Sequence, residues 1–216
     1  MDYKRFEKDA KPPRPRLEEQ EKLGEALENA VWKHDLMEVK RLLDAGANIR
    51  ARDEHGCTPL HKAVFSENEK LVKLLINRGA DIDAADFVGW TPLHYAARDG
   101  LIKIVRRLIN GGADINAGTL GSPLHLAITH SRVEVARLLI NRGADVKKAT
   151  AESGNTPLHL AASWVVPKVV RQLIGKGADV YAKNKNKKLP INVTKDVEIR
   201  KILREAMART AGKKHG

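Results

Sequence analysis

The sequence predicts an all-α solenoid, in which two-helix units stack in a line. A Thr/Ser-Pro-Leu-His motif occurs four times, and in each copy the aspartate of a Gly-Ala-Asp triplet follows 23 residues after the first residue of the motif. The stretch from that aspartate to the next motif varies between 8 and 11 residues. Self-similarity at a period of about 33 residues is typical of stacked repeats, in which no unit buries its apolar face alone. The four motifs begin at Thr58, Thr91, Ser122 and Thr156.

Each unit can be predicted element by element. Thr or Ser is a preferred N-cap, and proline is favoured at the first helical position because its missing N–H donor is not needed there. A second helix is predicted by apolar residues at helical spacing, such as Leu71, Val72 and Leu75. Gly79 and its equivalents then end this helix in the left-handed conformation. Capping-box patterns indicate where three of the second helices begin, at Asp35–Glu38, Ser66–Glu69 and Ser131–Glu134.

Taken together, these motifs resemble the ankyrin repeat, roughly from Glu21 to Ala208. The resemblance implies about six stacked helix–turn–helix units joined by β-hairpin fingers. Both end units are degenerate caps, because 23–47 lacks the four-residue motif and Leu189-Pro190 replaces Thr-Pro. We expect residues 1–20 to be a charged, proline-rich flexible tail and residues 209–216 to be a basic tail. The ankyrin-repeat domain is expected at 21–208, with units at about 21–52, 53–85, 86–118, 119–150, 151–183 and 184–208.

Composition indicates the cellular compartment. Cys57 is the only cysteine, so one chain forms neither a disulfide nor a cysteine-based metal site, and a reducing compartment is favoured. No apolar run approaches the ~18 residues of a membrane span. The charged segment 1–16 lacks the apolar stretch of a secretory signal. We therefore expect a monomeric intracellular array, cytoplasmic or nuclear, with no membrane insertion.

Catalytic and metal sites are not predicted. The motif histidines recur once per unit, and packed helices lie ~10 Å apart, whereas zinc ligands converge on a centre at ~2 Å. Cys57 has no oriented base–acid partner, and no glycine-rich phosphate loop occurs. We expect no enzyme activity and no cofactor. The ankyrin resemblance implies that each histidine and its cap residue join neighbouring hairpins through hydrogen bonds; these histidines are His61, His94, His125 and His159.

The resemblance also implies a binding surface. In ankyrin-type repeats the residues that face the partner lie on the fingers and just after the small residues of the first helix. Five of the nine aromatic residues fall in these places, and exposed aromatics on a concave surface mark an interface. We therefore expect a non-enzymatic scaffold or adaptor that binds a protein or peptide, unless the rings pack on neighbouring fingers instead. The expected partner-binding residues are Trp32, Lys33, Phe65, Phe87, Val88, Trp90, Arg98, Asp99, His130 and Trp164.

Basic residues suggest an alternative function. Residues 183–216 contain eleven Lys or Arg and three acids, in a chain of net charge +12. A basic C-terminal end attracts nucleic acid or another anionic surface. A cap that only keeps the last repeat soluble would have the same composition. The alternative is therefore an accessory protein that binds an anionic partner through Lys183, Lys185, Lys187 and Lys188. A third class, an inhibitor that covers an enzyme's site, has the same sequence features as a scaffold.

Two smaller features are left open by the sequence. Asn116 stands in a pattern similar to the one that asparaginyl hydroxylases modify on ankyrin repeats, so hydroxylation is one interpretation and a hydrogen bond within its own turn is the other. The apolar run 164–167 either rests against the C-terminal cap or extends the binding surface.

Overall fold

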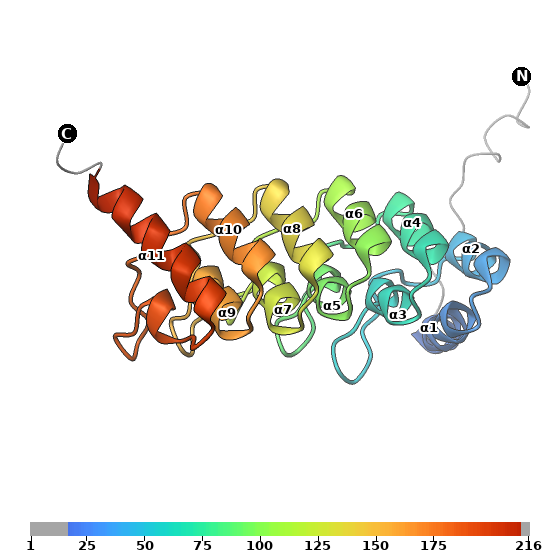
Figure 1. The fold of residues 1–216 in the computed structure, drawn as a ribbon. Coiled ribbons are helices and arrows are strands. Elements are labelled where there is room, and N and C mark those ends of the chain that lie inside the picture. The colour runs from blue at the N-terminus through green and yellow to red at the C-terminus, as the bar shows by residue number, and fades with distance from the viewer. Residues whose placement is uncertain (1–16, 213–216) are drawn as a thin grey trace, which may run out of the picture.

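The computed structural model describes residues 17–212, which form an elongated stack of paired helices with α1 and α11 at opposite ends (Figure 1). The all-α solenoid expected from the repeats is therefore confirmed. Residues 17–212 contain no β-strand, and the connections between units are turns and bends. The β-hairpin character expected of the fingers is not confirmed. No helix in this part of the chain is long and apolar enough to cross a membrane.

The helices form two rows. Contacts run along each row and across each pair, as expected of repeats that pack mainly on their neighbours. The first-helix row contains α1 (Leu17–Trp32), α3 (Pro59–Phe65), α5 (Pro92–Asp99), α7 (Pro123–Thr129), α9 (Pro157–Ser163) and the short 3₁₀ helix η2 (Pro190–Asn192). The second-helix row contains α2 (Leu36–Asp44), α4 (Glu69–Asn77), α6 (Ile102–Asn110), α8 (Val133–Asn141), α10 (Pro167–Gly175) and α11 (Val197–Gly212).

The core lies between the rows. The motif leucines of the first helices, which include Leu60 and Leu93, are fully buried. They meet leucines of the second helices, such as Leu75 and Leu108, which are also fully buried. Small residues such as Ala96 lie between them and allow the helices to approach closely. Because this arrangement recurs in every full unit, the apolar core is continuous along the stack.

In two of the three capping-box patterns the predicted N-cap residue is wrong, although the second helix begins within two residues of the predicted start. Asp35 is the N-cap of α2 and accepts a hydrogen bond from the Glu38 amide at 2.9 Å, as predicted. Helix α4 instead begins after Asn68, because Ser66 is the C-cap of α3. Helix α8 begins after Arg132. Ser131 has a φ of 55°, which is incompatible with the extended conformation of an N-cap.

Both ends of the stack extend further than predicted. Residues 17–20, which we assigned to a flexible tail, form the first turn of α1, where acidic Glu18 and Glu19 interact favourably with the helix dipole. Residues 209–212, assigned to a basic tail, continue α11. The remaining tail residues, 1–16 and 213–216, lie outside the described residues. In the last unit the first helix is reduced to η2, where Asn192 Oδ1 accepts the Leu189 amide at 3.1 Å.

Candidate functional site

Three of the fingers that connect the units are built on a short turn that one side chain holds. The carboxylate of Asp86 accepts the backbone amides of Val88 and Trp90 at 2.9 and 2.8 Å. Neighbouring fingers are joined by a backbone hydrogen bond from Phe87 to His55 at 3.1 Å. Gly56 has a φ of 79°, and a Cβ there would lie 2.7 Å from the Phe87 ring, so only glycine fits beneath that ring. Asp53 and Asn184 hold their own fingers in the same way as Asp86.

The four motif histidines connect each unit to the next finger. His125 Nδ1 lies 2.8 Å from the Ser122 hydroxyl, and Nε2 lies 2.9 Å from the carbonyl oxygen of Lys148. Burial lowers the pKa of His125 to about 4, and burial likewise lowers the pKa of the other three. The rings are therefore neutral near pH 7 and serve as connections between units. The equivalent Nε2 contacts are His61 to Trp90, His94 to Gly121 and His159 to Lys188.

Two observations concern possible metal binding and nucleophilic chemistry among the described residues. Within residues 17–212, no group of three or more His, Cys, Asp or Glu side chains could hold a metal ion. Cys57 is buried, and burial raises the pKa of its thiol. A protonated, enclosed thiol is a poor nucleophile.

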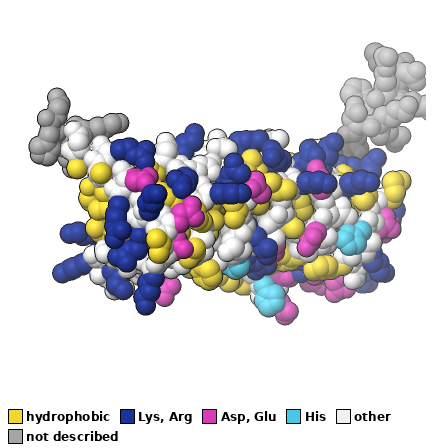
Figure 2. Space-filling model, viewed as in Figure 1, with side chains coloured by type: hydrophobic (Ala, Val, Ile, Leu, Met, Phe, Trp, Pro, Cys, Tyr) yellow, Lys and Arg dark blue, Asp and Glu magenta, His cyan; other side chains and the backbone are white. Residues whose placement is uncertain are grey.

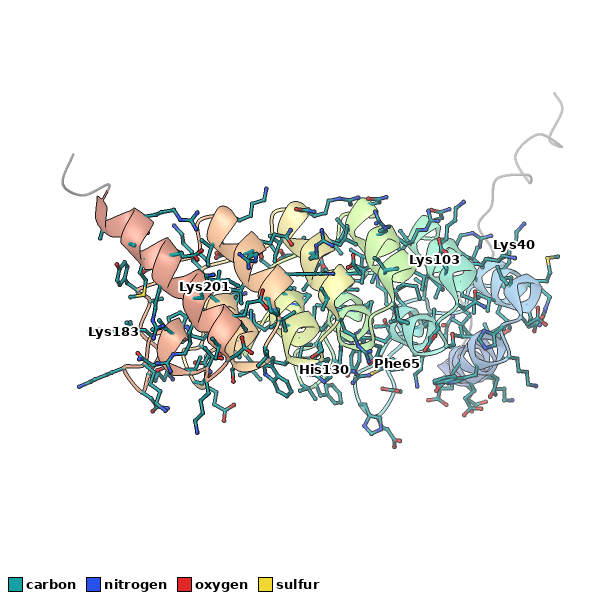
Figure 3. All side chains as sticks on the ribbon, viewed as in Figure 1. Lys40, Phe65, Lys103, His130, Lys183 and Lys201 are labelled. Atoms are coloured by element: carbon teal, nitrogen blue, oxygen red, sulfur yellow. The ribbon has the colours of Figure 1, made fainter. Side chains whose placement is uncertain are left out.

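Three aromatic side chains lie exposed on the side of the fingers and first helices. The exposed fraction is 46% for Trp32 at the end of α1, 74% for Phe87 on a finger and 52% for Trp164 at the end of α9. Val88 on the finger is also exposed. Exposure of apolar rings to water is unfavourable, so covering them with a partner would lower the free energy. Lys33 and His130 are exposed as well, and Figure 3 shows His130 on the same side of the stack as Phe65.

The other two predicted aromatics pack against a residue that the sequence analysis did not select. Tyr95 lies at the centre of a cluster, with ring centroids 4.7 Å from Phe65 and 5.1 Å from Trp90, both edge-on. Phe65 and Trp90 are consequently only partly exposed. Phe65 and Trp90 therefore pack on neighbouring residues, which was the alternative to an exposed binding surface.

A charged group covers this cluster. The Arg98 guanidinium lies 4.9 Å from the Tyr95 ring centroid and 5.7 Å from that of Trp90, and it forms an ion pair with Asp99 at 2.7 Å. The Tyr95 hydroxyl donates a hydrogen bond to Asp86. Burial and this hydrogen bond raise the pKa of Tyr95. The arrangement presents Arg98 in one fixed orientation, because both its stacking and its ion pair are already formed.

A second charged cluster joins α3 to the first unit. Lys62 Nζ lies 2.6 Å from Glu28 on α1 and 2.6 Å from Asp53 on the first finger. Burial alone would lower the pKa of Lys62, but these hydrogen bonds outweigh it and raise the pKa. The cluster borders a cavity of about 400 Å³ between α1 and the first finger, which Cys57 also lines.

Asn116 has a structural role that its sequence pattern did not reveal. Its Oδ1 accepts the backbone amide of Asp145 in the next unit at 2.8 Å. Asp83 accepts the amide of Asp114 in the same way at 2.9 Å. Hydroxylation of Asn116 stays a prediction, and its carboxamide is already engaged in joining two units.

The match to a known family covers most of the stack. A family model described as ankyrin repeats, in three copies, matches residues 27–119 and 118–184. The chain belongs to the ankyrin-repeat family. Ankyrin repeats generally mediate protein–protein interactions, and ankyrin-repeat proteins are typically not enzymes. Comparison with curated proteins gives no match.

Two features distinguish the C-terminal part of this ankyrin-repeat protein. The four lysines predicted to attract anions are all exposed on the last finger. In the apolar run 164–167, Trp164 and Val165 are exposed while Val166 is buried in the core. Val165 has a φ of 54°, a left-handed conformation that is unfavourable for a β-branched residue. The run thus presents an exposed tryptophan beside a strained turn.

Proposed function

We propose that this ankyrin-repeat protein is a scaffold or adaptor that binds a protein or peptide on one face. We call this the recognition face and define it by Trp32, Phe65, Phe87, Trp90 and Trp164. The supporting observation is that three of these rings are between 46% and 74% exposed. Tryptophan and tyrosine are favoured at interface hot spots, where truncation to alanine costs ~2 kcal/mol or more.

The two kinds of aromatic residue on this face have different proposed roles. Trp32, Phe87 and Trp164 are anchors that become buried when the partner docks. Phe65 and Trp90 pack around Tyr95 and hold Arg98 in place, so that an already oriented charge meets the partner. A charge held in advance loses little conformational entropy on binding. Lys33, Asp99 and His130 would then set the partner's orientation at the edge of the contact.

The experiment compares two triple variants of the purified protein. Trp32→Ser, Phe87→Ser and Trp164→Ser together remove the exposed rings of the recognition face. The control carries Met37→Ser, Lys40→Ser and Val197→Ser, which remove exposed side chains from the second-helix row instead. A partner captured by the unmodified protein is identified by mass spectrometry, and its affinity for each variant is measured by calorimetry.

We expect the ring variant to bind the partner at least about tenfold more weakly, since tenfold corresponds to 1.4 kcal/mol. The control variant should retain the affinity. Equal affinity of all three proteins would remove the recognition face from the binding site.

The exposed lysines of the last finger favour a second candidate function. Lys183, Lys185 and Lys187 are exposed to solvent. Lys185 Nζ also donates a hydrogen bond to the Ala151 carbonyl oxygen of the preceding finger at 2.6 Å. An anionic surface could be held there by charge. Contacts with phosphate weaken steeply as salt rises, whereas an aromatic interface changes little. A salt titration of the captured complex therefore separates the two functions.

A further inference from the structure

One basic side chain recurs at the same place on every helix of the second-helix row. In each of these helices it stands two residues before a leucine that is at most 2% exposed. All six basic side chains are exposed to solvent. Because successive helices in a row pack ~10 Å apart, the six side chains extend over roughly 50 Å. We call them the basic column: Lys40, Lys73, Arg106, Arg137, Arg171 and Lys201.

Acidic residues of the same row cancel only part of this charge, because they pair with Arg137 and Arg171 of the column and with no other member. Helices α6 and α10 contain no acid. Each acid on the other four helices already forms an ion pair with an arginine. Among residues 17–212, no ion pair involves Lys40, Lys73, Arg106 or Lys201. The acid–arginine pairs are Glu38–Arg41, Asp44–Arg78, Glu69–Arg107, Glu134–Arg137, Glu198–Arg171 and Glu205–Arg209.

The fingers differ from one another in charge: most of them carry acidic residues, whereas the last one is basic. Asp53, Asp86 and Glu152 lie on the fingers, away from the second-helix row. Figure 2 shows lysine and arginine side chains recurring along the edge of the second helices, and Figure 3 labels Lys40 and Lys201 on α2 and α11. The six second helices contain 14 Lys or Arg and six Asp or Glu, so a large part of the net positive charge lies on this row, which is separate from the recognition face.

We propose that the basic column binds the phosphate backbone of double-stranded nucleic acid, independently of the partner on the recognition face. A linear row of cations about 50 Å long is complementary in charge and shape to a rod-shaped polyanion, and it corresponds to about 15 base pairs of duplex. Contacts of this kind carry no sequence information, because they meet phosphates and not base edges.

The composition of the row favours a duplex over other anionic partners. None of its six helices contains Trp, Tyr or Phe. Single-stranded nucleic acid is normally held by bases stacked on aromatic rings. Anionic membranes also attract lysine and arginine clusters, but peripheral membrane helices usually combine them with Trp, Phe or Leu side chains that enter the headgroup layer. A face with regularly spaced cations and no aromatic ring matches the outside of a duplex, which offers phosphates and no exposed base faces.

The test uses two charge-matched variants of the full chain. The column variant carries Lys40→Gln, Lys73→Gln, Arg106→Gln and Lys201→Gln, so it removes the four cations that have no ion pair and leaves both paired arginines. The finger variant carries Lys183→Gln, Lys185→Gln, Lys187→Gln and Lys188→Gln and loses the same charge elsewhere. Circular dichroism melting checks that both are folded. Fluorescence anisotropy then measures binding to labelled DNA and RNA duplexes of about 20 base pairs across a salt series.

We expect the unmodified protein to bind duplex with an affinity that falls steeply with salt. The column variant should bind at least about tenfold more weakly, and the slope of log K against log salt should decrease by about 3.6, since each of the four lost phosphate contacts contributes ~0.9. The finger variant should keep most of the affinity and slope.

Three outcomes would overturn the proposal. If both variants lose affinity equally, net charge and not the column is responsible. If single strands of equal length bind more tightly than duplex, the column does not recognise the paired phosphate backbones of a duplex. If the unmodified protein binds vesicles of mixed phosphatidylcholine and phosphatidylserine but no duplex, the partner of the column is a membrane surface. Failure of partner binding on the recognition face would leave all these results unchanged, so the two proposals are tested separately.

Discussion

His61 Nε2 lies 3.1 Å from the carbonyl oxygen of Trp90, a residue 29 positions further along the chain. Its Nδ1 lies 2.9 Å from the Thr58 hydroxyl and also accepts the Thr58 amide at 3.1 Å. One imidazole thus fixes both the start of its own helix and the base of the next finger. Because Nδ1 accepts and Nε2 donates, the ring must be neutral. The stability of the stack is therefore connected to pH.

We expect the free energy of unfolding to fall as pH is lowered below 6.5. Burial lowers the pKa of each motif histidine in the folded chain below the ordinary value of 6.5. The unfolded chain therefore binds more protons in that range, and each neutral histidine contributes up to ~1.4 kcal/mol per pH unit. For His125 the loss continues to a pH of about 4. Urea unfolding at pH 7, 6 and 5 measures it.

The matched variant for this prediction is His125→Gln. Glutamine at this position can still accept a hydrogen bond from the N-cap residue but does not titrate. Its unfolding free energy should vary less between pH 7 and pH 5 than that of the unmodified protein. Parallel pH curves for the two proteins would contradict the assignment.

Trp90→Ala should lower the free energy of unfolding by about 2 kcal/mol while leaving the array folded. The ring is partly buried, contacts Tyr95 and lies beneath Arg98, so its loss removes packing and a cation–π contact. Phe87→Ala should change stability by less than about 0.5 kcal/mol, since that ring is 74% exposed. Equal losses in urea unfolding would refute the division into packed and exposed rings.

Leu75→Ala should cost ~2–5 kcal/mol of stability, because Leu75 is fully buried and its truncation leaves a cavity between the rows. The neighbouring Leu74 is only partly buried, so Leu74→Ala should cost clearly less. Thermal unfolding of both variants measures the difference. An unchanged melting temperature for Leu75→Ala would show that this face is not the core.

Val165→Asn should stabilise the protein by about 1 kcal/mol. Val165 has a φ of 54°, and asparagine adopts this left-handed conformation at less cost than a β-branched residue. The side chain is half exposed, so the polar replacement is not enclosed. Val166→Asn is the opposite control: Val166 is buried, and a polar group there should destabilise. A loss of stability in Val165→Asn would mean that its contacts outweigh the strain.

The repeated motif was sufficient to predict the stack, because the N-cap, the proline and the terminal glycine each act within a few residues. The role of the motif histidines was implied by the family resemblance and not by local chemistry. Capping preferences did not predict the start of α4. Ser66 and Asn68 are both suitable N-cap residues, and only the backbone conformation shows that Asn68 is the N-cap. The residue types alone do not determine that backbone conformation.

Parts of the candidate sites depend on neighbours that lie about one repeat away. Tyr95 follows the motif histidine and contacts Phe65 of the preceding unit, so its importance appears only when two units are placed side by side. The basic column was hidden for a related reason. Basic second helices alternate along the chain with fingers that carry acids, so a charge count over continuous segments averages the two. Comparing equivalent positions between repeats would have revealed both features.

Contacts in this protein run along each row and across each pair. Duplicating or deleting one complete internal repeat would therefore create no new type of junction, because every full unit presents nearly the same surfaces to its two neighbours. Gene rearrangement could therefore change the length of the molecule by one repeat at a time. Each added repeat would lengthen the recognition face and the second-helix row together.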